Sequence, residues 1–185
     1  MKITREDAWK LLTEYTQKEA LIKHALSVEA AMRAYAEKFG EDVEAWGVVG
    51  LIHDFDYEKH PTPAEHPFVG VKILREKGWP EEWIQAILGH ADYSGVPRET
   101  LLAKTLFAVD ELCGFITAVT YVRPSRSLTE VKVKSVKKKL KDKRFAAAVS
   151  REDIRNGAEA LGVDLDEHID FTIKAMQGIA GQLGL

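Results

Sequence analysis

Cysteine is nearly absent from this sequence, with Cys113 its single example among 185 residues. One cysteine excludes an internal disulfide, and a fold without disulfides suits a reducing compartment. The chain also lacks any run of roughly 18 uncharged apolar residues, so we expect no transmembrane helix. The opening segment Thr4-Arg5-Glu6-Asp7 is polar and acidic, unlike a signal peptide. We therefore expect a cytoplasmic protein.

A large excess of one charge is also missing. The formal net charge is −3, and this balance predicts no general affinity for nucleic acid or for a membrane surface. Hydrophobic residues make up 45% of the chain, as in soluble globular proteins. A chain of this length can bury a core without disulfides, so we expect one domain over residues 1–185.

No segment alternates between apolar and polar residues as a half-buried strand would. Apolar residues instead recur at steps of three and four, which predicts an all-α fold. The expected helices lie at about 5–15, 18–38, 43–53, 67–77, 80–90, 98–122, 132–144 and 151–161, with a last one from Asp164 or Asp166. Prolines make residues 55–65 a loop. The helices at about 128–185 form a C-terminal extension.

The expected helix at 43–53 is apolar on every side, which is typical of a central, buried helix. It ends at His53-Asp54, two side chains that can bind metal. A carboxylate has two oxygens, so Asp54 could contact one ion or bridge two.

Six residues of this kind lie within or beside apolar helical segments. They are His24, His53, Asp54, His66, His90 and Asp110. Asp110 lies in the middle of the longest apolar helix, where an unpaired carboxylate is costly unless a cation or a proton neutralises it. Lys104 lies off its helix face. Nitrogen and oxygen donors without thiolate suit Fe, Mn, Ni, Co or Zn better than Ca.

The order His, His-Asp, His, His, Asp resembles the HD-domain superfamily of metal-dependent phosphohydrolases, in its two-metal, HDIG-type form. The resemblance covers His24 to Asp110, about half of the chain. Leu51-Ile52-His53-Asp54 resembles the signature segment of that family, and the segment from His66 to Gly70 resembles the helix start that follows it.

The resemblance implies an HD-type helical bundle, with a ligand-bearing core at about 18–123. It implies a first metal held by His24, His53, Asp54 and Asp110. His66 and His90 would hold a second metal, with Asp54 bridging the two. The cofactors would be two divalent ions drawn from Fe, Mn, Ni, Co, Zn or Mg. The implied reaction is hydrolysis of a phosphomonoester or phosphodiester by metal-activated water, on a small phosphorylated substrate that could be a nucleotide.

The sequence departs from the family pattern directly after the pair. Many relatives have a lysine there that can donate a proton, whereas this chain reads Phe55-Asp56-Tyr57. Asp56, Lys59 and Asp92 are the candidates to replace that lysine, with Asp54 as the central catalytic carboxylate.

The substrate phosphates need cations, and the candidates are Lys104, Arg123 and Arg126. The lysine-rich segment 132–144 favours a solvated face, with a phosphate-binding or nucleotide-binding lip as the alternative. We expect His168 on the surface.

Two alternatives from other classes stay open at this point. One is a di-iron oxygenase of the same superfamily, which cleaves a C–H bond with O₂ on the same six ligands. The other is a non-catalytic metal-binding helical module.

Overall fold

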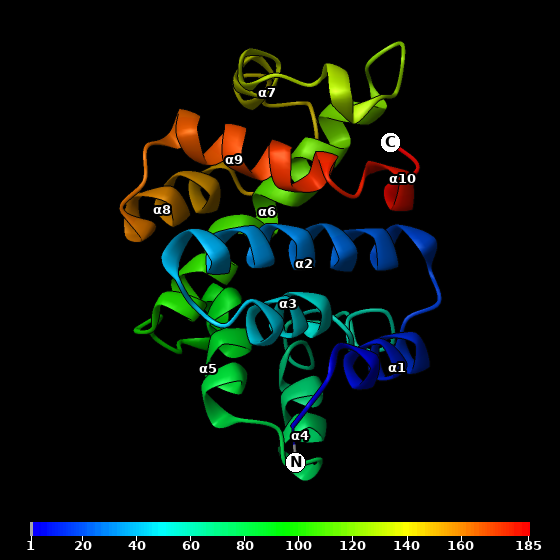
Figure 1. The fold of residues 1–185 in the computed structure, drawn as a ribbon, viewed down its shortest axis with the longest axis vertical. Helices are drawn as coiled ribbons and strands as arrows, with labels where there is room; N and C mark the ends of the chain where they lie inside the picture. The colour runs from blue at the N-terminus through cyan, green and yellow to red at the C-terminus, as the bar shows by residue number, and fades with distance from the viewer. Residues whose placement is uncertain (1) are drawn as a thin grey trace.

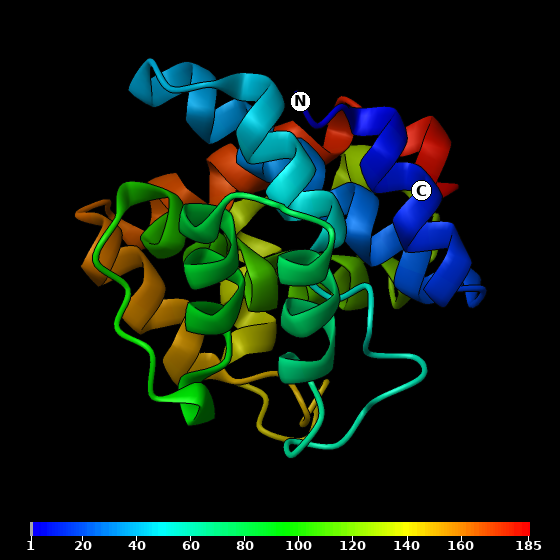
Figure 2. The same ribbon diagram turned by 90° about the horizontal axis from the view of Figure 1, so that it is seen from below.

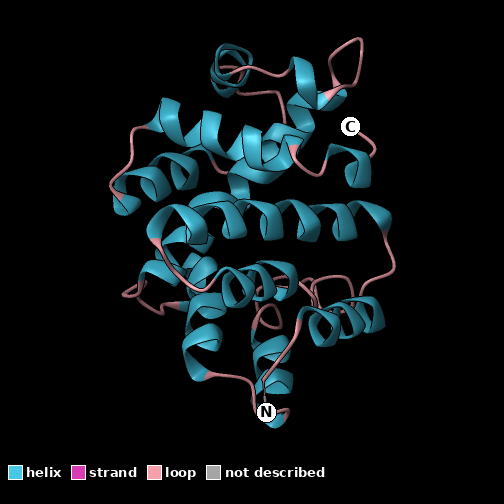
Figure 3. Ribbon diagram, viewed as in Figure 1, coloured by secondary structure: helices cyan, strands magenta, loops and turns pink. Residues whose placement is uncertain are grey.

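The computed structural model describes residues 2–185, and in that range the chain is helical with no strand (Figure 3). The predicted all-α class is therefore confirmed. The α-helices are α1 (Arg5–Tyr15), α2 (Glu19–Phe39), α3 (Val43–Ile52), α4 (Phe68–Glu76), α5 (Glu81–His90), α6 (Leu101–Tyr121), α7 (Val133–Leu140), α8 (Arg151–Leu161), α9 (Leu165–Gln177) and α10 (Ala180–Leu183). Two short 3-10 helices, η1 (Asp92–Ser94) and η2 (Leu128–Glu130), lie in the connections.

Local sequence determines where most of these helices begin and end. Thr4 and Asp7 form a capping box at the start of α1, because each side chain bonds the backbone N–H of the other. The side chain of Ser150 accepts from the backbone of the third residue after it, which starts α8. Gly40 and Gly162 end α2 and α8 in the left-handed conformation that glycine adopts freely.

Two expected boundaries need correction. The long helix begins at Leu101 rather than Arg98, because Thr100 caps it by accepting from the Ala103 N–H. The lysine-rich helix ends at Leu140 rather than near residue 144. Beyond Leu140 the guanidinium of Arg151 donates to main-chain carbonyls of the segment 142–149 and holds it in turns. Such bonds from a side chain to main-chain carbonyls leave no periodic signal in the sequence.

Helix α2 crosses the middle of the molecule (Figure 1). Helices α1, α3, α4 and α5 lie on one side of it, and α7, α8 and α9 lie on the other. Helix α6 joins the two sides, since it packs against α5 and α2 and also against α8, α9 and α7. The view from below shows α4 and α5 side by side (Figure 2).

Helix α3 is central, as its uniform hydrophobicity predicts. Its residues from Trp46 to Ile52 are buried, and α2 packs closely over it. Gly50 permits this approach, because a Cβ there would lie 3.0 Å from the backbone oxygen of Val28. Gly157 does the same for α8 against α6, where a Cβ would lie 2.7 Å from Cα of Ala108. Close helix packing thus fixes the positions from which the functional side chains extend.

His168 is not a surface residue, and that expectation was wrong. Its side chain on α9 is fully buried, with Nε2 donating to the carbonyl of Ala108 at 2.8 Å. The hydroxyl of Tyr35 on α2 donates to its Nδ1 at 2.5 Å. His168 lies on the face of α9 that packs against α2 and α6, and its two hydrogen bonds link these three helices. Its partner on α6, Ala108, lies two residues before Asp110.

None of the helices within residues 2–185 combines the length and the apolar character that crossing a membrane requires.

Candidate metal centre

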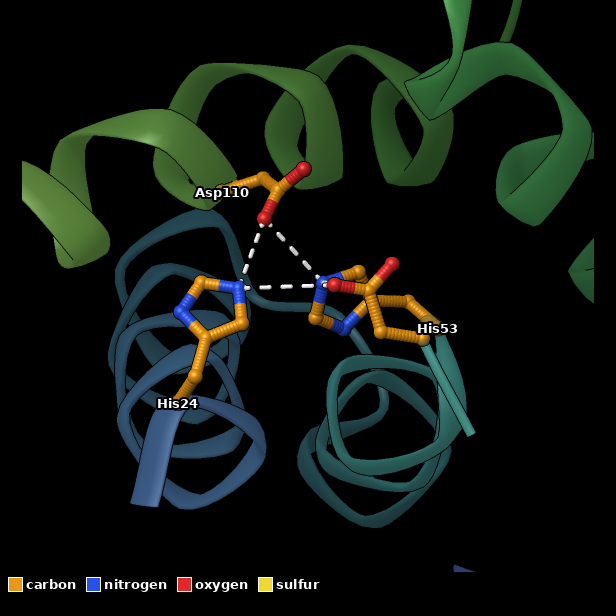
Figure 4. A group of neighbouring side chains, drawn as sticks. His24, His53 and Asp110 are labelled. Carbon is orange, nitrogen blue, oxygen red and sulfur yellow. Dashed lines mark hydrogen bonds and ion pairs between the residues drawn. The ribbon is translucent and has the colours of Figure 1, made fainter. Parts of the chain in front are cut away.

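Six histidine and aspartate side chains meet on the α5 and α6 side of α2. They are His24 on α2, His53 and Asp54 immediately after α3, His66 just before α4, His90 at the end of α5 and Asp110 in the middle of α6. Figure 4 shows His24, His53 and Asp110 pointing toward one another from three separate elements. The structure therefore brings together all six residues that the sequence singles out, although they span 86 positions between His24 and Asp110.

The first group contains His24, His53, Asp54 and Asp110, whose ligand atoms all lie within 4.8 Å of one another. Asp110 Oδ1 lies 2.9 Å from Nε2 of His24 and 3.1 Å from Nε2 of His53. Asp54 contributes its Oδ2 atom, 3.3 Å from Nε2 of His53 and 3.7 Å from that of His24. Two nitrogens and two carboxylates thus surround one position.

The second group contains Asp54, His66 and His90, again with ligand atoms within 4.8 Å of one another. Here Asp54 contributes its other oxygen, because Oδ1 lies 3.2 Å from Nε2 of His66 and 3.1 Å from Nε2 of His90. Each oxygen of Asp54 therefore faces a different group. This is the arrangement that a carboxylate shared between two ions requires.

Three of the imidazoles are oriented by a hydrogen bond at their far nitrogen. Nδ1 of His53 donates to the carbonyl of Gly50 at 2.7 Å, and Nδ1 of His90 donates to the carbonyl of Ile87. Both acceptors lie one turn earlier on the same helix. The remaining nitrogen, Nε2, then carries its lone pair toward the centre, which is how a metal-binding histidine is held.

His66 precedes its helix and has no such carbonyl, and Asp56 takes that role. The side chain of Asp56 is buried, and its Oδ1 accepts from His66 Nδ1 at 2.6 Å. Its Oδ2 accepts from the backbone N–H of Gly70 at 2.8 Å. Only glycine fits there, because a Cβ on Gly70 would lie 2.9 Å from Cγ of Asp56. Asp56 thus lies behind His66, not in the cavity where a proton donor would act.

Charged residues of the cluster strongly shift one another's pKa values. Burial lowers the pKa of His66, but hydrogen bonds with Asp54 and Asp56 outweigh burial and raise this pKa to about 9. Burial also opposes the ionised form of Asp110, yet the charge of His53 keeps the pKa of that carboxyl well below its ordinary value. The carboxylates of Asp54 and Asp110 therefore stay ionised, and His66 carries a proton that a cation can replace. Such nitrogen and oxygen donors fit a divalent ion.

The cluster opens into a cavity of about 440 Å³. Besides His24, Asp54, His66, His90 and Asp110, its lining consists of Tyr57, Ala91, Asp92, Tyr93, Glu111, Gly114, Ala148, Val149 and Asp153. Neither lysine nor arginine is among these residues. The cavity can therefore hold a small molecule beside the cluster, and its own wall is acidic.

Of the other residues predicted for the site, some line the cavity and some do not. Asp92 lines the cavity, where it pairs with Arg98 at 2.7 Å. Lys59 does not line it: Nζ donates to the carbonyl of Glu14 at 3.3 Å and lies over the ring of Tyr15.

The three predicted phosphate-binding cations, Lys104, Arg123 and Arg126, are also absent from the lining. The guanidinium of Arg123 lies 4.0 Å from Glu130, beyond the C-terminal end of α6. The structure does not bring these three side chains to the metal cluster.

Sequence reasoning did not single out Glu111 and Asp153. Burial raises the pKa of Glu111, and the nearby charge of Asp110 adds to this. Burial and then the charge of Asp92 raise the pKa of Asp153. Glu111 follows a predicted ligand directly, which was a usable signal. Asp153 lies in the first turn of α8, where an acidic residue is ordinary and gives no sign of a site.

Comparison with known proteins agrees with this geometry. A model of the HD domain family matches residues 21–114, just over half of the chain, and this protein belongs to that family. HD-domain proteins are generally metal-dependent hydrolases. Ribonuclease Y of Lawsonia intracellularis (strain PHE/MN1-00) is 30% identical over 103 residues, which are 55% of this chain and 19% of that protein. The chain thus matches about a fifth of that relative's length. No solved structure matches the chain.

Asp56→Asn tests whether Asp56 orients His66. The amide keeps the size of the side chain but loses the charge that favours a proton on His66 Nδ1. Loss of such a partner lowers metal affinity by about 10–100-fold, and we expect a decrease of that size in a chelator-competition titration with Mn²⁺. Asp170→Asn is the matched control on α9, where Asp170 pairs with Lys174. Equal affinities in the two variants would contradict the assignment.

Proposed function

We propose that this protein hydrolyses a phosphomonoester or phosphodiester, using two divalent ions held by the six clustered residues. The observation that carries the proposal is the position of Asp54, whose Oδ1 and Oδ2 each face a separate group of ligands. When bound, such ions supply Lewis acidity, which acidifies water and withdraws charge from a phosphate.

The protein side chains would then have three tasks: they would hold the ions, keep the imidazoles oriented, and donate a proton to the leaving group. His24, His53 and Asp110 would hold one ion, and His66 and His90 the other, with Asp54 common to both. The carbonyl partners of His53 and His90 keep these rings from turning. Because His53 is only 1% exposed, water does not compete at its far side.

A proton donor for the leaving group is the third task, and we assign it to the Asp92–Asp153 pair. Asp153 lines the cavity, and burial and the charge of Asp92 raise its pKa, the direction that a general acid needs. Arg98 pairs with Asp92 at 2.7 Å. Of the donors expected from sequence, Asp56 and Lys59 do not line the cavity, so Asp92 is the one that belongs to this pair.

The comparisons support the reaction class without naming the substrate. The family is generally hydrolytic. The Lawsonia relative is named a ribonuclease, which is an enzyme that cleaves phosphodiesters, although its match covers a small part of it. The cavity volume of about 440 Å³ suits a small phosphorylated compound, and we propose a nucleotide-like one.

Release of phosphate or of a nucleotide under anaerobic conditions tests this function directly. Hydrolysis needs Lewis acidity alone, so Mn²⁺ should support turnover of a phosphoester panel without O₂. The control is the protein treated with chelator, which should be inactive. Turnover that requires iron and consumes O₂ in proportion to product would instead assign the protein to the oxygenases.

Metal stoichiometry of three variants tests the ligand assignment. We expect His90→Ala to lose one ion, because it removes a ligand of the second group only. Asp54→Ala should lose both, because it removes a ligand from each group. His60→Ala is the matched control, since His60 contacts Glu65 in the loop before α4 and belongs to neither group. Elemental analysis after dialysis measures the ratio, and full retention of metal by Asp54→Ala would show that it does not bridge.

A further inference from the structure

A second groove, of about 370 Å³, lies beside the metal cavity and is basic. Its lining consists of Leu140, Lys141, Lys143, Ala147, Val149, Arg151 and Arg155. No carboxylate is among these residues. Val149 lines both this groove and the metal cavity, while Ala148 lines the cavity and Ala147 the groove. The segment 147–149 therefore separates two adjacent hollows of opposite charge.

The cations of the groove are of two kinds. Arg151 is structural, because its guanidinium donates to the carbonyls of Ala146 at 2.7 Å and Val149 at 3.1 Å. Lys141, Lys143 and Arg155 are exposed, and the described residues offer them no carboxylate at ion-pair distance. These three charges are available to a ligand.

The rest of the lysine-rich segment differs from the groove. Lys137 on α7 pairs with Asp166 at 2.9 Å, and Lys139 lies over the ring of Phe145. Lys134 and Lys138 are exposed on α7 and line neither hollow. Helix α7 itself thus fits the expected solvated face, and the cations that border the site come after its end.

The wall between the two hollows is held in place from both sides. The backbone N–H of Ser150 donates to Oε2 of Glu111 at 3.0 Å, which ties the segment to α6 beside the metal cluster. On the groove side, the Arg151 guanidinium bonds the carbonyls described above. The spacing between cavity and groove is therefore fixed by the fold.

Charge decides what can occupy each hollow. One phosphate fits at the metal cluster, because bound cations would neutralise it. A second phosphate inside the cavity would face Asp92, Glu111 and Asp153, with no lysine or arginine in the lining. Across Val149, the same phosphate would meet three free cations. Electrostatics thus favours a substrate that extends from the cavity over residues 147–149 into the groove.

We propose that the groove binds a second phosphate of the substrate, so that the substrate carries at least two phosphates, as in a dinucleotide with a terminal phosphate. This inference rests on the proposed phosphoester hydrolysis, but the groove as an anion site does not require it. A free phosphate ion has the same chemistry, and the experiment has to distinguish the two sources.

The kinetic arm compares a dinucleotide that has one internal phosphate with the same dinucleotide carrying a terminal phosphate. We expect the double variant Lys143→Glu/Arg155→Glu to lower the kcat/KM ratio of the two-phosphate to the one-phosphate substrate by about tenfold, mainly through KM. The effect should shrink at high salt, because the cations are exposed. The control Lys134→Glu/Lys138→Glu makes the same change in net charge on α7 and should leave that ratio as in wild type.

The binding arm needs no turnover. Inorganic pyrophosphate is titrated into the Mg²⁺-loaded protein, and amide NMR shifts are followed separately at the metal cluster and in residues 141–147, which include lining residues of the groove and none of the cavity. We expect shifts in 141–147 for wild type and the α7 control, and none for Lys143→Glu/Arg155→Glu. Far-UV circular dichroism and thermal unfolding verify that both variants fold.

The outcomes separate the two claims. No shifts in 141–147 with wild type would overturn the groove as an anion site. Shifts there combined with an unchanged kcat/KM ratio would identify a site for a free anion and overturn the claim that it holds a substrate phosphate. Shifts without hydrolysis of any phosphoester would overturn the proposed function and leave the anion site in place.

Discussion

The carboxylate of Asp54 contacts imidazoles from both ligand groups, and the packing of the surrounding helices determines whether it can do so. Its position depends on α3 ending at Ile52, because His53 and Asp54 follow the helix directly and converge there, with Nε2 of His53 3.3 Å from Oδ2 of Asp54. Helix α3 in turn needs Gly50 to approach α2, which carries His24. Helices α5 and α6 must then pack together to bring His90 and Asp110 to the two groups that share Asp54. A displaced Asp54 would leave buried imidazoles without their counter-charge, which is costly.

Much of this arrangement could be predicted from sequence. Helical periodicity, capping residues and glycines predicted most of the helices. The six clustered residues could be selected as candidate ligands because polar side chains in apolar helices need a partner to offset their burial. What could not be predicted depends on contacts between distant segments. His168 looks like an ordinary polar residue of an amphipathic helix until Tyr35 and Ala108 are placed around it. The role of Asp56 similarly depends on the positions of His66 and Gly70.

The cations illustrate the same limit. Lys104, Arg123 and Arg126 follow or flank a predicted ligand in the chain, but helix α6 carries them away from the cavity. Arg155, more than 40 residues after Asp110, lines the hollow next to it. A charged residue near Asp110 in the sequence need not lie near the cavity in the fold. Helix α6 is long, and its two ends pack against helices on opposite sides of α2. The acidic cavity and the basic groove exist only once α8 packs on α6.

The central claim is that Asp54 is shared between two metal ions, and anomalous diffraction from crystals grown with Mn²⁺ tests it most directly. The account predicts two anomalous peaks about 3.5–4 Å apart. One should lie among His24, His53, Asp110 and Oδ2 of Asp54, and the other among His66, His90 and Oδ1 of Asp54. A single peak at saturating Mn²⁺, or a pair of peaks that does not include Asp54 between them, would contradict the account.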